Sequence, residues 1–272
     1  DIEAAKDLLA KVTPADPTER LRVALMSAEM SVVQDKTEEA IQTLEAARVE
    51  FPDATEPARS LAVLLLRRTD QAARCEEVLK QALGRARTAG AKRELGLLLG
   101  AAYDRWGRGD EAIALFDGLA QADPNAIWVR RRLLEYPKVL SDTGRGQKLV
   151  DQIKAIEGEA GWQWRYEQAR VWFAAKDFSR DYAHGVTLLK ENVLANPNDR
   201  ESRRLLAGAY ERAGEMQLAL TTYRQALDQW PDDLSLVIAT VSALYRAGEY
   251  DQADRILAQA SSRKLSSPAL EG

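Results

Sequence analysis

The chain offers few side chains of the kinds that carry out chemistry. It holds one cysteine, Cys75, and one histidine, His184. A lone thiol and a lone imidazole fall short of the ligand count of an ordinary zinc site, and no serine or cysteine near His184 stands in a nucleophile context. Gly144, Arg145 and Gly146 do not complete a phosphate-binding loop, and we interpret them as a turn between two helices. The sequence therefore predicts no catalytic residue, no metal, no cofactor and no enzyme activity.

The remaining candidates are charged residues, 42 Asp and Glu against 38 Lys and Arg. Along helical surfaces such charges are expected without any acid–base pair. Because they nearly cancel, no overall field would draw the chain to nucleic acid or to an anionic membrane. The strongest apolar run, Leu61 to Leu66, is far below the ~20 residues of a membrane span. We predict a soluble protein, cytoplasmic or periplasmic, with no nucleic-acid partner and no membrane span.

Internal repetition predicts the elements that position these residues. With 46% hydrophobic residues among 272, the chain can bury a sizeable core. Two sets of five residues share the intervals 4, 5, 4 and 8. The sets are Tyr103, Gly107, Ala112, Phe116 and Pro124, and Tyr210, Gly214, Ala219, Tyr223 and Pro231. Five coincident intervals indicate a repeated structural unit.

The same intervals recur in other parts of the chain. The further copies are Gly248, Ala253 and Ala260; Ala40, Leu44, Ala47 and Pro52; Gly185, Leu189, Asn192 and Pro197; and, more weakly, Cys75, Leu79 and Ala82. A small residue early in a second helix lets the first helix approach, and a larger residue one turn later fills the space beside it. Glycine ends the first helix and proline stops the second. At Cys75, this pattern favours an inert buried thiol.

The stretch from Leu99, Gly100 and Tyr103 through Pro124 resembles the tetratricopeptide consensus, whose period is 34 residues. The resemblance implies an all-α, α-α superhelix (solenoid) of about seven helical hairpins with a leading helix at Ile2 to Leu9. We expect one solenoid over residues 1–262 and a polar tail over 263–272. The hairpins are expected at 18–52, 57–87, 91–124, 126–158, 161–197, 200–231 and 234–262.

Three places depart from the consensus. Ser31 and Asp35 stand where tyrosine and glycine are expected, which affects the first turn. Pro137 falls inside a predicted first helix and should kink it near Arg132 to Leu134. Extra residues after Phe173 predict a protruding loop over 177–184, which would carry His184.

The resemblance also implies a partner-binding concave groove made by the first helices. The groove positions carried over repeat by repeat are Arg22, Leu25 and Glu29; Ser60 and Leu64; Glu94, Leu97, Ala101 and Asp104; Arg131, Leu134 and Lys138; Trp164, Glu167 and Val171; and Glu201, Arg204, Glu211 and Arg212. This lining is mixed in charge and partly apolar, which suits a peptide or helix better than a polyphosphate. The family's two-carboxylate clamp needs Lys-x-x-x-Asn on a first helix, and that spacing is absent.

Aromatic residues are concentrated over 162–182, where Trp164 is the first choice for an exposed anchor. We favour the alternative that these rings fill an irregular core, since aromatic residues at helical spacing are usually buried. Arg130, Arg131 and Arg132 are consecutive, so a helix spreads them apart over a solvated face.

We predict a scaffold that binds a peptide or helix of a partner protein. The alternative is a structural or assembly segment of a larger bacterial multi-protein complex, for example envelope or exopolysaccharide-export machinery. We expect the chain to be part of a longer protein. Its last hairpin should then expose Leu244 and Leu257, which would allow self-association through end repeats.

Overall fold

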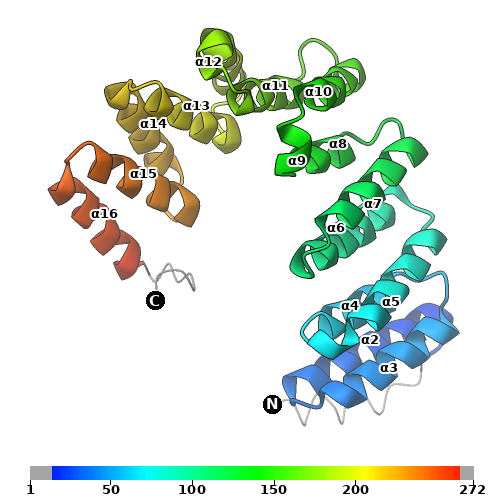
Figure 1. Ribbon diagram of the computed structural model, residues 1–272. Helices are drawn as coiled ribbons and strands as arrows, with labels where there is room; N and C mark the ends of the chain where they lie inside the picture. Colours follow the sequence, from blue (N-terminus) through cyan, green and yellow to red (C-terminus); the bar gives the residue numbers. More distant parts are fainter. Residues whose placement is uncertain (1–13, 264–272) are drawn as a thin grey trace. The chain divides into compact units, whose positions relative to one another are not determined.

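The structure, a computed structural model, describes residues 14–263. Within these residues every regular element is a helix and no strand occurs, as the sequence predicts. The contacts divide the chain into two compact units, unit 1 ending at Pro124 and unit 2 beginning at Asn125. Each unit is a series of helices that pack on their neighbours in sequence (Figure 1).

The described helices form seven hairpins, three in unit 1 and four in unit 2. Unit 1 contains α2 (Pro17–Val33), α3 (Thr37–Glu50), α4 (Glu56–Leu65), the short 3-10 helix η1 (Thr69–Gln71), α5 (Ala72–Arg85), α6 (Ala89–Arg105) and α7 (Gly109–Ala122). Unit 2 contains α8 (Ile127–Leu134), α9 (Pro137–Leu140), α10 (Thr143–Glu157), α11 (Trp162–Ala174), α12 (Phe178–Ala195), α13 (Arg200–Arg212), α14 (Met216–Gln229), α15 (Leu234–Arg246) and α16 (Tyr250–Ser262). This confirms the predicted all-α hairpin repeat of the α-α superhelix class.

In the fourth hairpin, α8 and α9 together form the first arm. We call α2, α4, α6, α8, α9, α11, α13 and α15 the first helices, and α3, α5, α7, α10, α12, α14 and α16 the second helices. The predicted leading helix at Ile2 to Leu9 lies outside the described residues, as does the predicted tail beyond Arg263. That the hairpins form one continuous solenoid stays a prediction.

Small residues allow the two arms of a hairpin to touch. Ala112 on α7 is fully buried, and Phe116 one turn later is fully buried too. Gly100 on α6 lies so close to the Phe116 ring that a Cβ at residue 100 would overlap it. In unit 2, Gly185 and Phe173 show the same close approach. The repeated small and large residues therefore set the distance between the arms.

The turns between the arms share one backbone conformation. Gly107, Gly214 and Gly248 have φ of 71°, 82° and 77°, in the left-handed region that glycine adopts at little cost. Asp35 occupies the same place in the first hairpin with φ of 59°. In that turn the Lys36 amide donates to the Ser31 carbonyl at 2.8 Å, as the Glu215 amide does to Tyr210 at 2.9 Å. The first hairpin therefore keeps the turn without the glycine.

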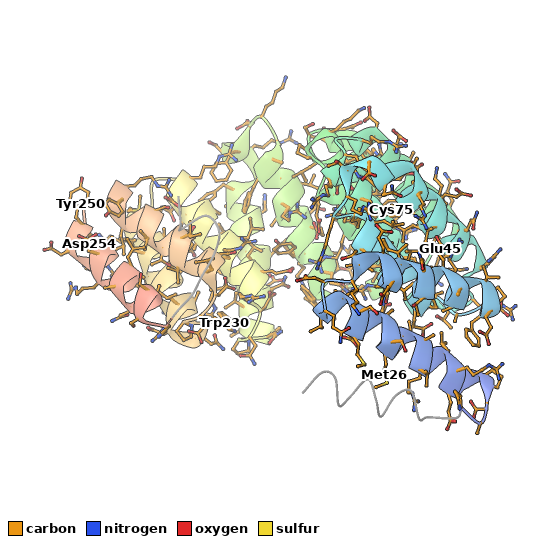
Figure 2. All side chains as sticks on the ribbon, turned by 90° about the horizontal axis from the view of Figure 1, so that it is seen from below. Met26, Glu45, Cys75, Trp230, Tyr250 and Asp254 are labelled. Carbon is orange, nitrogen blue, oxygen red and sulfur yellow. The ribbon has the colours of Figure 1, made fainter. Side chains whose placement is uncertain are left out.

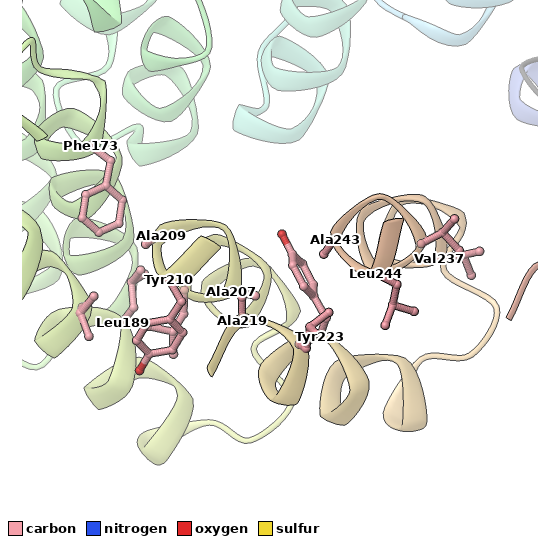
Figure 3. Close-up of a cluster of buried hydrophobic side chains, with 14 of the residues drawn as sticks. Phe173, Leu189, Ala207, Ala209, Tyr210, Ala219, Tyr223, Val237, Ala243 and Leu244 are labelled. Carbon is pink, nitrogen blue, oxygen red and sulfur yellow. The ribbon is translucent and has the colours of Figure 1, made fainter. Parts of the chain in front are cut away.

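One core cluster of unit 2 runs through the hairpins from α11 to α16. Figure 3 shows Phe173, Leu189, Tyr210, Tyr223 and Leu244, which come from α11 to α15 in order. Leu244 is fully buried, so the prediction that it would be exposed is wrong. Leu257 is partly buried against the same cluster. Each hairpin thus covers its neighbour's apolar side, as expected for a repeat protein.

Pro137 breaks its helix instead of kinking it. Helix α8 ends at Leu134, and Tyr136 takes an extended conformation with φ of −79° and ψ of 122°. Proline disfavours a helical residue before it, because its ring crowds that residue's backbone. Pro137 itself begins α9, where its missing N–H leaves no helical hydrogen bond unmade.

Two predicted loops are helical. Asp177 caps α12, its Oδ1 accepting from the Arg180 amide at 3.3 Å, so residues 178–184 form the first turns of that helix rather than a protruding loop. Asp142 caps α10 in the same way, accepting from the Arg145 amide at 3.0 Å. Gly144 and Gly146 therefore lie inside α10, and the interpretation of this stretch as a turn is wrong.

Candidate functional site

A groove of about 470 Å³ runs between α2 and α4, the first helices of the first two hairpins. We call it the unit 1 groove. Its lining residues are Leu25, Ala28, Glu29, Val32, Leu44, Glu56, Arg59, Ser60, Val63, Leu64 and Arg67. Leu25, Glu29, Ser60 and Leu64 were predicted as groove residues from the sequence. The structure brings these four together.

The spacing of the lining residues explains how two helices make the groove. On α2, Leu25, Ala28, Glu29 and Val32 stand at i, i+3, i+4 and i+7, so they share one helix face. Residues 56, 59, 60, 63 and 64 share one face of α4 by the same rule, and Arg67 lies in the turn that follows this helix. Val32 and Val63 were not predicted from the sequence. Helical spacing could have identified them, because Val32 is seven residues after Leu25 and Val63 is three residues after Ser60.

The unit 1 groove has an apolar floor and a charged rim. Ala28 is 2% exposed and too small to fill the space above it, while Val63 on the wall is 41% exposed. The rim carries two carboxylates and two guanidinium groups, those of Glu29, Glu56, Arg59 and Arg67. An apolar strip between opposite charges is the arrangement that accepts an amphipathic peptide or helix.

The predicted groove residues on α6 lie beyond this rim. Glu94 forms an ion pair with Arg59, with Arg59 Nη1 2.8 Å from Glu94 Oε2. Leu97 is half-buried and Asp104 is exposed on the same helix. The ion pair therefore places α6 next to the groove wall of α4.

The first helices of unit 2 carry a charged network. Arg131 on α8 contacts Glu167 on α11 at 2.9 Å and Glu201 on α13 at 2.6 Å. Arg170 contacts Glu167 at 2.7 Å and donates to the Leu134 carbonyl at 3.2 Å. These contacts join three first helices, and Arg131, Glu167 and Glu201 among them were assigned to partner binding from the sequence.

Glu167 is the centre of this network and is 0% exposed. Burial raises the pKa of its carboxyl, because a low-dielectric environment disfavours the charged form, while Arg170 and Arg131 act in the opposite direction. A carboxylate so enclosed by two guanidinium groups has no access to an incoming ligand. Glu167 therefore positions the first helices of unit 2.

The other predicted residues of unit 2 differ in their contacts and in their exposure. Glu211 forms an ion pair with Arg246 at 2.5 Å. Arg212 donates to the Phe173 carbonyl and lies 4.2 Å from the centroid of the Phe178 ring. Arg204 and Lys138 are exposed.

Trp164 lies in the core and is 9% exposed. Its Nε1 donates to the Glu159 carbonyl at 3.3 Å, and Lys154 Nζ lies 4.4 Å from its ring centroid. Tyr166 and Phe173 are buried as well, which is the core interpretation that we favoured for this aromatic stretch. Trp162, at 39% exposed, is the most accessible of these rings on α11.

Residues with potential chemistry lie apart from one another. Cys75 is fully buried within unit 1 (Figure 2), and burial, with a smaller effect of Glu76, raises the pKa of its thiol to about 11. His184 is on α12 with its ring 6.1 Å from that of Trp172. Among residues 14–263, no three His, Cys, Asp or Glu side chains are arranged to hold a metal ion. Within the same residues, no helix is both long and apolar enough to cross a membrane.

Helical hairpins that pack on their neighbours in sequence define a helical-repeat protein. Two family models, both described as tetratricopeptide repeat, match residues 178–233 and 211–271. The repeat intervals, the hairpins and these matches agree, and together they support a tetratricopeptide-repeat protein. Tetratricopeptide repeats generally mediate protein–protein interaction and are typically non-catalytic.

One solved structure shows the same fold, and two others are less similar. A tetratricopeptide repeat protein from Parabacteroides merdae is 14% identical with a TM-score of 0.63, and the match covers 89% of this chain and 92% of that one. The C-terminal part of a tetratricopeptide repeat-containing protein from Cytophaga hutchinsonii is 12% identical with a TM-score of 0.48, covering 88% and 92%. MamA is 18% identical with a TM-score of 0.40, covering 61% and 94%. No curated protein matches the sequence.

Proposed function

We propose that the chain is a protein-interaction scaffold and that the unit 1 groove holds an apolar-faced helix or an extended peptide of a partner protein. The observation that carries this proposal is the groove itself, an apolar cleft of about 470 Å³ between two first helices. Apolar surface of this kind is stabilised when a partner covers it.

The chemistry of the rim defines what the partner presents. Leu25, Val32, Val63 and Leu64 receive apolar side chains at helical spacing. Both signs of charge stand on the rim, so the partner's flanking residues are mixed in charge. Glu94, Leu97 and Asp104 on α6 extend the same binding path, and in unit 2 the exposed first-helix residues include Arg204, Arg212 and Lys138. We leave Trp164 out of the proposed contact set, because it is buried.

Two exposed valines provide a matched test. Val63 is 41% exposed and lines the groove, whereas Val49 is 77% exposed on the second helix α3. Neither side chain is needed to fill the core, so Val63→Asp and Val49→Asp should both fold. The wild-type chain and both variants are used for affinity capture from lysate of the source cell, with mass spectrometry of what each retains.

The proposal predicts a partner that the wild type and Val49→Asp retain and Val63→Asp loses. A carboxylate in the groove wall disfavours apolar contact there, whereas the same change on α3 does not touch the groove. The same partners on all three chains would contradict binding in the unit 1 groove.

A second candidate function, assembly with further protein chains, is favoured by the last described hairpin. Ile238, Tyr245 and Tyr250 are 45%, 44% and 57% exposed on α15 and α16. The two tyrosine rings lie 5.5 Å apart and form one exposed aromatic surface. Sedimentation velocity over a hundredfold concentration range tests this role, and a strict monomer throughout would count against it.

A further inference from the structure

A second groove lies between α14 and α16, which are second helices. We call it the α14–α16 groove. Its volume is about 450 Å³, and its lining residues are Arg224, Leu227, Asp228, Pro231, Val237, Gln252, Arg255, Ile256, Gln259, Ala260 and Arg263. All of them belong to the last two hairpins of unit 2, so this groove is distinct from the unit 1 groove.

An equivalent place in unit 1 shows why this groove is open. The repeat intervals align Ala47 and Pro52 with Ala226 and Pro231, so residue 48 corresponds to residue 227. Between α3 and α5, Arg48 lines a space of only about 10 Å³. Arg48 is held across that space, its Nη1 donating to Gln81 Oε1 at 3.0 Å.

In the last hairpins the side-chain bridge between α14 and α16 is made at a different position, where Arg224 Nη2 donates to Gln252 Oε1 at 2.7 Å. Leu227 replaces Arg48, and its aliphatic side chain has no polar atom that could form a hydrogen bond with α16. In unit 1, Glu45 forms an ion pair with Arg48 at 2.7 Å and orients it. The residue that corresponds to Glu45 is Arg224, so the last hairpins lack this carboxylate as well. Gln259 and Arg263, the equivalents of Gln81 and Arg85, line the groove without such a partner from α14.

The floor of the α14–α16 groove is apolar. Val237 and Ala260 are 2% and 6% exposed, and Leu227 and Ile256 pack against the core from above. Figure 3 shows Val237 on α15, next to the buried Leu244. A side chain that enters between α14 and α16 would therefore meet aliphatic groups.

The rim of the same groove carries an excess of positive charge. Three arginines line it against one carboxylate, that of Asp228. Arg224 is neutralised by Glu249 at 2.7 Å. Arg263 has a carboxylate only at 3.9 Å, from Asp232, and the Arg255 Nε donates to the Asp251 carbonyl at 3.1 Å. Arg255 and Arg263 are exposed and available to anions.

We propose that the α14–α16 groove docks an acidic peptide segment of a partner protein. A large apolar side chain of the segment enters above Val237 and Ile256, and flanking Asp or Glu residues pair with Arg255 and Arg263. Charge complementarity selects an acidic partner over a basic one, because like charges would meet at the rim. This inference goes beyond the proposed function, since it concerns the second helices and a different unit.

A peptide selection tests the proposal directly. Phage-displayed random 12-residue peptides are selected on the full chain, and the affinity of each enriched peptide is measured for four variants. Arg255→Glu/Arg263→Glu reverses the rim charge. Leu227→Arg fills the groove, and Arg85→Glu is the matched control at the unit 1 equivalent of Arg263. Val63→Asp reports binding in the unit 1 groove, and circular dichroism shows that each variant is folded.

We expect enriched peptides that carry two or more acidic residues around a Leu, Ile, Phe or Trp. They should bind the wild type and Arg85→Glu equally and the double arginine variant about tenfold or more weakly, because two charge pairs are replaced by repulsion. If Leu227→Arg does not fold, the affinity of the peptides for Arg255→Glu/Arg263→Glu still tests the proposal. Enrichment of no acidic peptide, equal binding to the double variant, or loss only with Val63→Asp would overturn the proposal.

Discussion

At the scale of residues, the buried Glu167 shows how a first helix can carry charge without offering it to a partner. Its carboxylate has one guanidinium from α8 and one from its own helix, at 2.9 Å and 2.7 Å. The sequence predicted the first-helix position of Glu167 correctly. Its burial could not be predicted, because it depends on how close Arg131 comes from a helix 36 residues away.

Replacing Glu167 tests the network. Glu167→Gln removes the carboxylate that pairs with Arg170 and one of the two carboxylates that pair with Arg131. The free energy of unfolding should therefore fall by about 3 kcal/mol. Glu201→Gln is the matched control, since Glu201 is 47% exposed and also contacts Arg131. It should cost less than about 1 kcal/mol. Urea unfolding followed by tryptophan fluorescence measures both, and equal small losses would contradict a structural role for Glu167.

Glu76 makes the stability of unit 1 depend on pH. Hydrogen bonding by Arg108 lowers the pKa of Glu76 to about 2, with support from Lys80 and Tyr103 against the effect of burial. The unfolded chain has the ordinary value of 4.5. A lowered folded pKa means stability that is present above pH 4.5 and lost as the pH falls toward 2, by about 1–2 kcal/mol after screening.

The measurement compares urea midpoints at pH 7 and pH 3 for the wild type, Glu76→Gln and Glu77→Gln. Glu76→Gln should be less stable than the wild type at pH 7 and lose less on acidification. Glu77, exposed and next in sequence, serves as the control and should leave the pH dependence unchanged. A Glu76→Gln profile parallel to that of the wild type would be the contradicting result.

At the scale of elements, the turns were the most predictable part of the fold. Glycine at three turns indicated a left-handed residue after the first helix, and the same conformation holds at Asp35 with φ of 59°. The sequence did not show whether the first hairpin keeps this turn without glycine. The hydrogen bond from the Lys36 amide to the Ser31 carbonyl shows that the first hairpin keeps the turn.

The left-handed residue gives opposite predictions for two substitutions. Asp35→Gly relieves a side chain from an unfavourable φ and should stabilise unit 1 by about 0.5–1 kcal/mol. Gly214→Ala introduces that strain in unit 2 and should destabilise it by about 1 kcal/mol. Thermal unfolding followed by circular dichroism compares the two, and a shift of the same sign in both would contradict this account of the turns.

Helix boundaries near irregular residues were less predictable than the repeats. Pro137 indicated a disturbance, yet only the extended Tyr136 shows that the helix stops and restarts. The stretch after Phe173 was expected to protrude, because its extra residues shift the repeat register. Capping by Asp177 and the 5.3 Å ring contact between Phe178 and Tyr182 instead continue α12 toward its N-terminus.

At the scale of the whole molecule, the two units use the same hairpin for different surfaces. Unit 1 keeps an apolar groove between first helices and closes the gap between α3 and α5 with Arg48. Unit 2 links its first helices by ion pairs and leaves the gap between α14 and α16 open. The repeat pattern predicts the hairpins of both units, whereas single substitutions such as Arg48 to Leu227 decide which surfaces are open.

The central claim is that a partner protein binds to the first helices of unit 1. Hydrogen exchange followed by mass spectrometry, on the full chain with and without its captured partner, tests this most directly. The account predicts slower exchange in α2 and α4, and little change in α3 and α5 beyond their contacts with those helices. Unchanged exchange in α2 and α4, with protection confined to second helices, would contradict it.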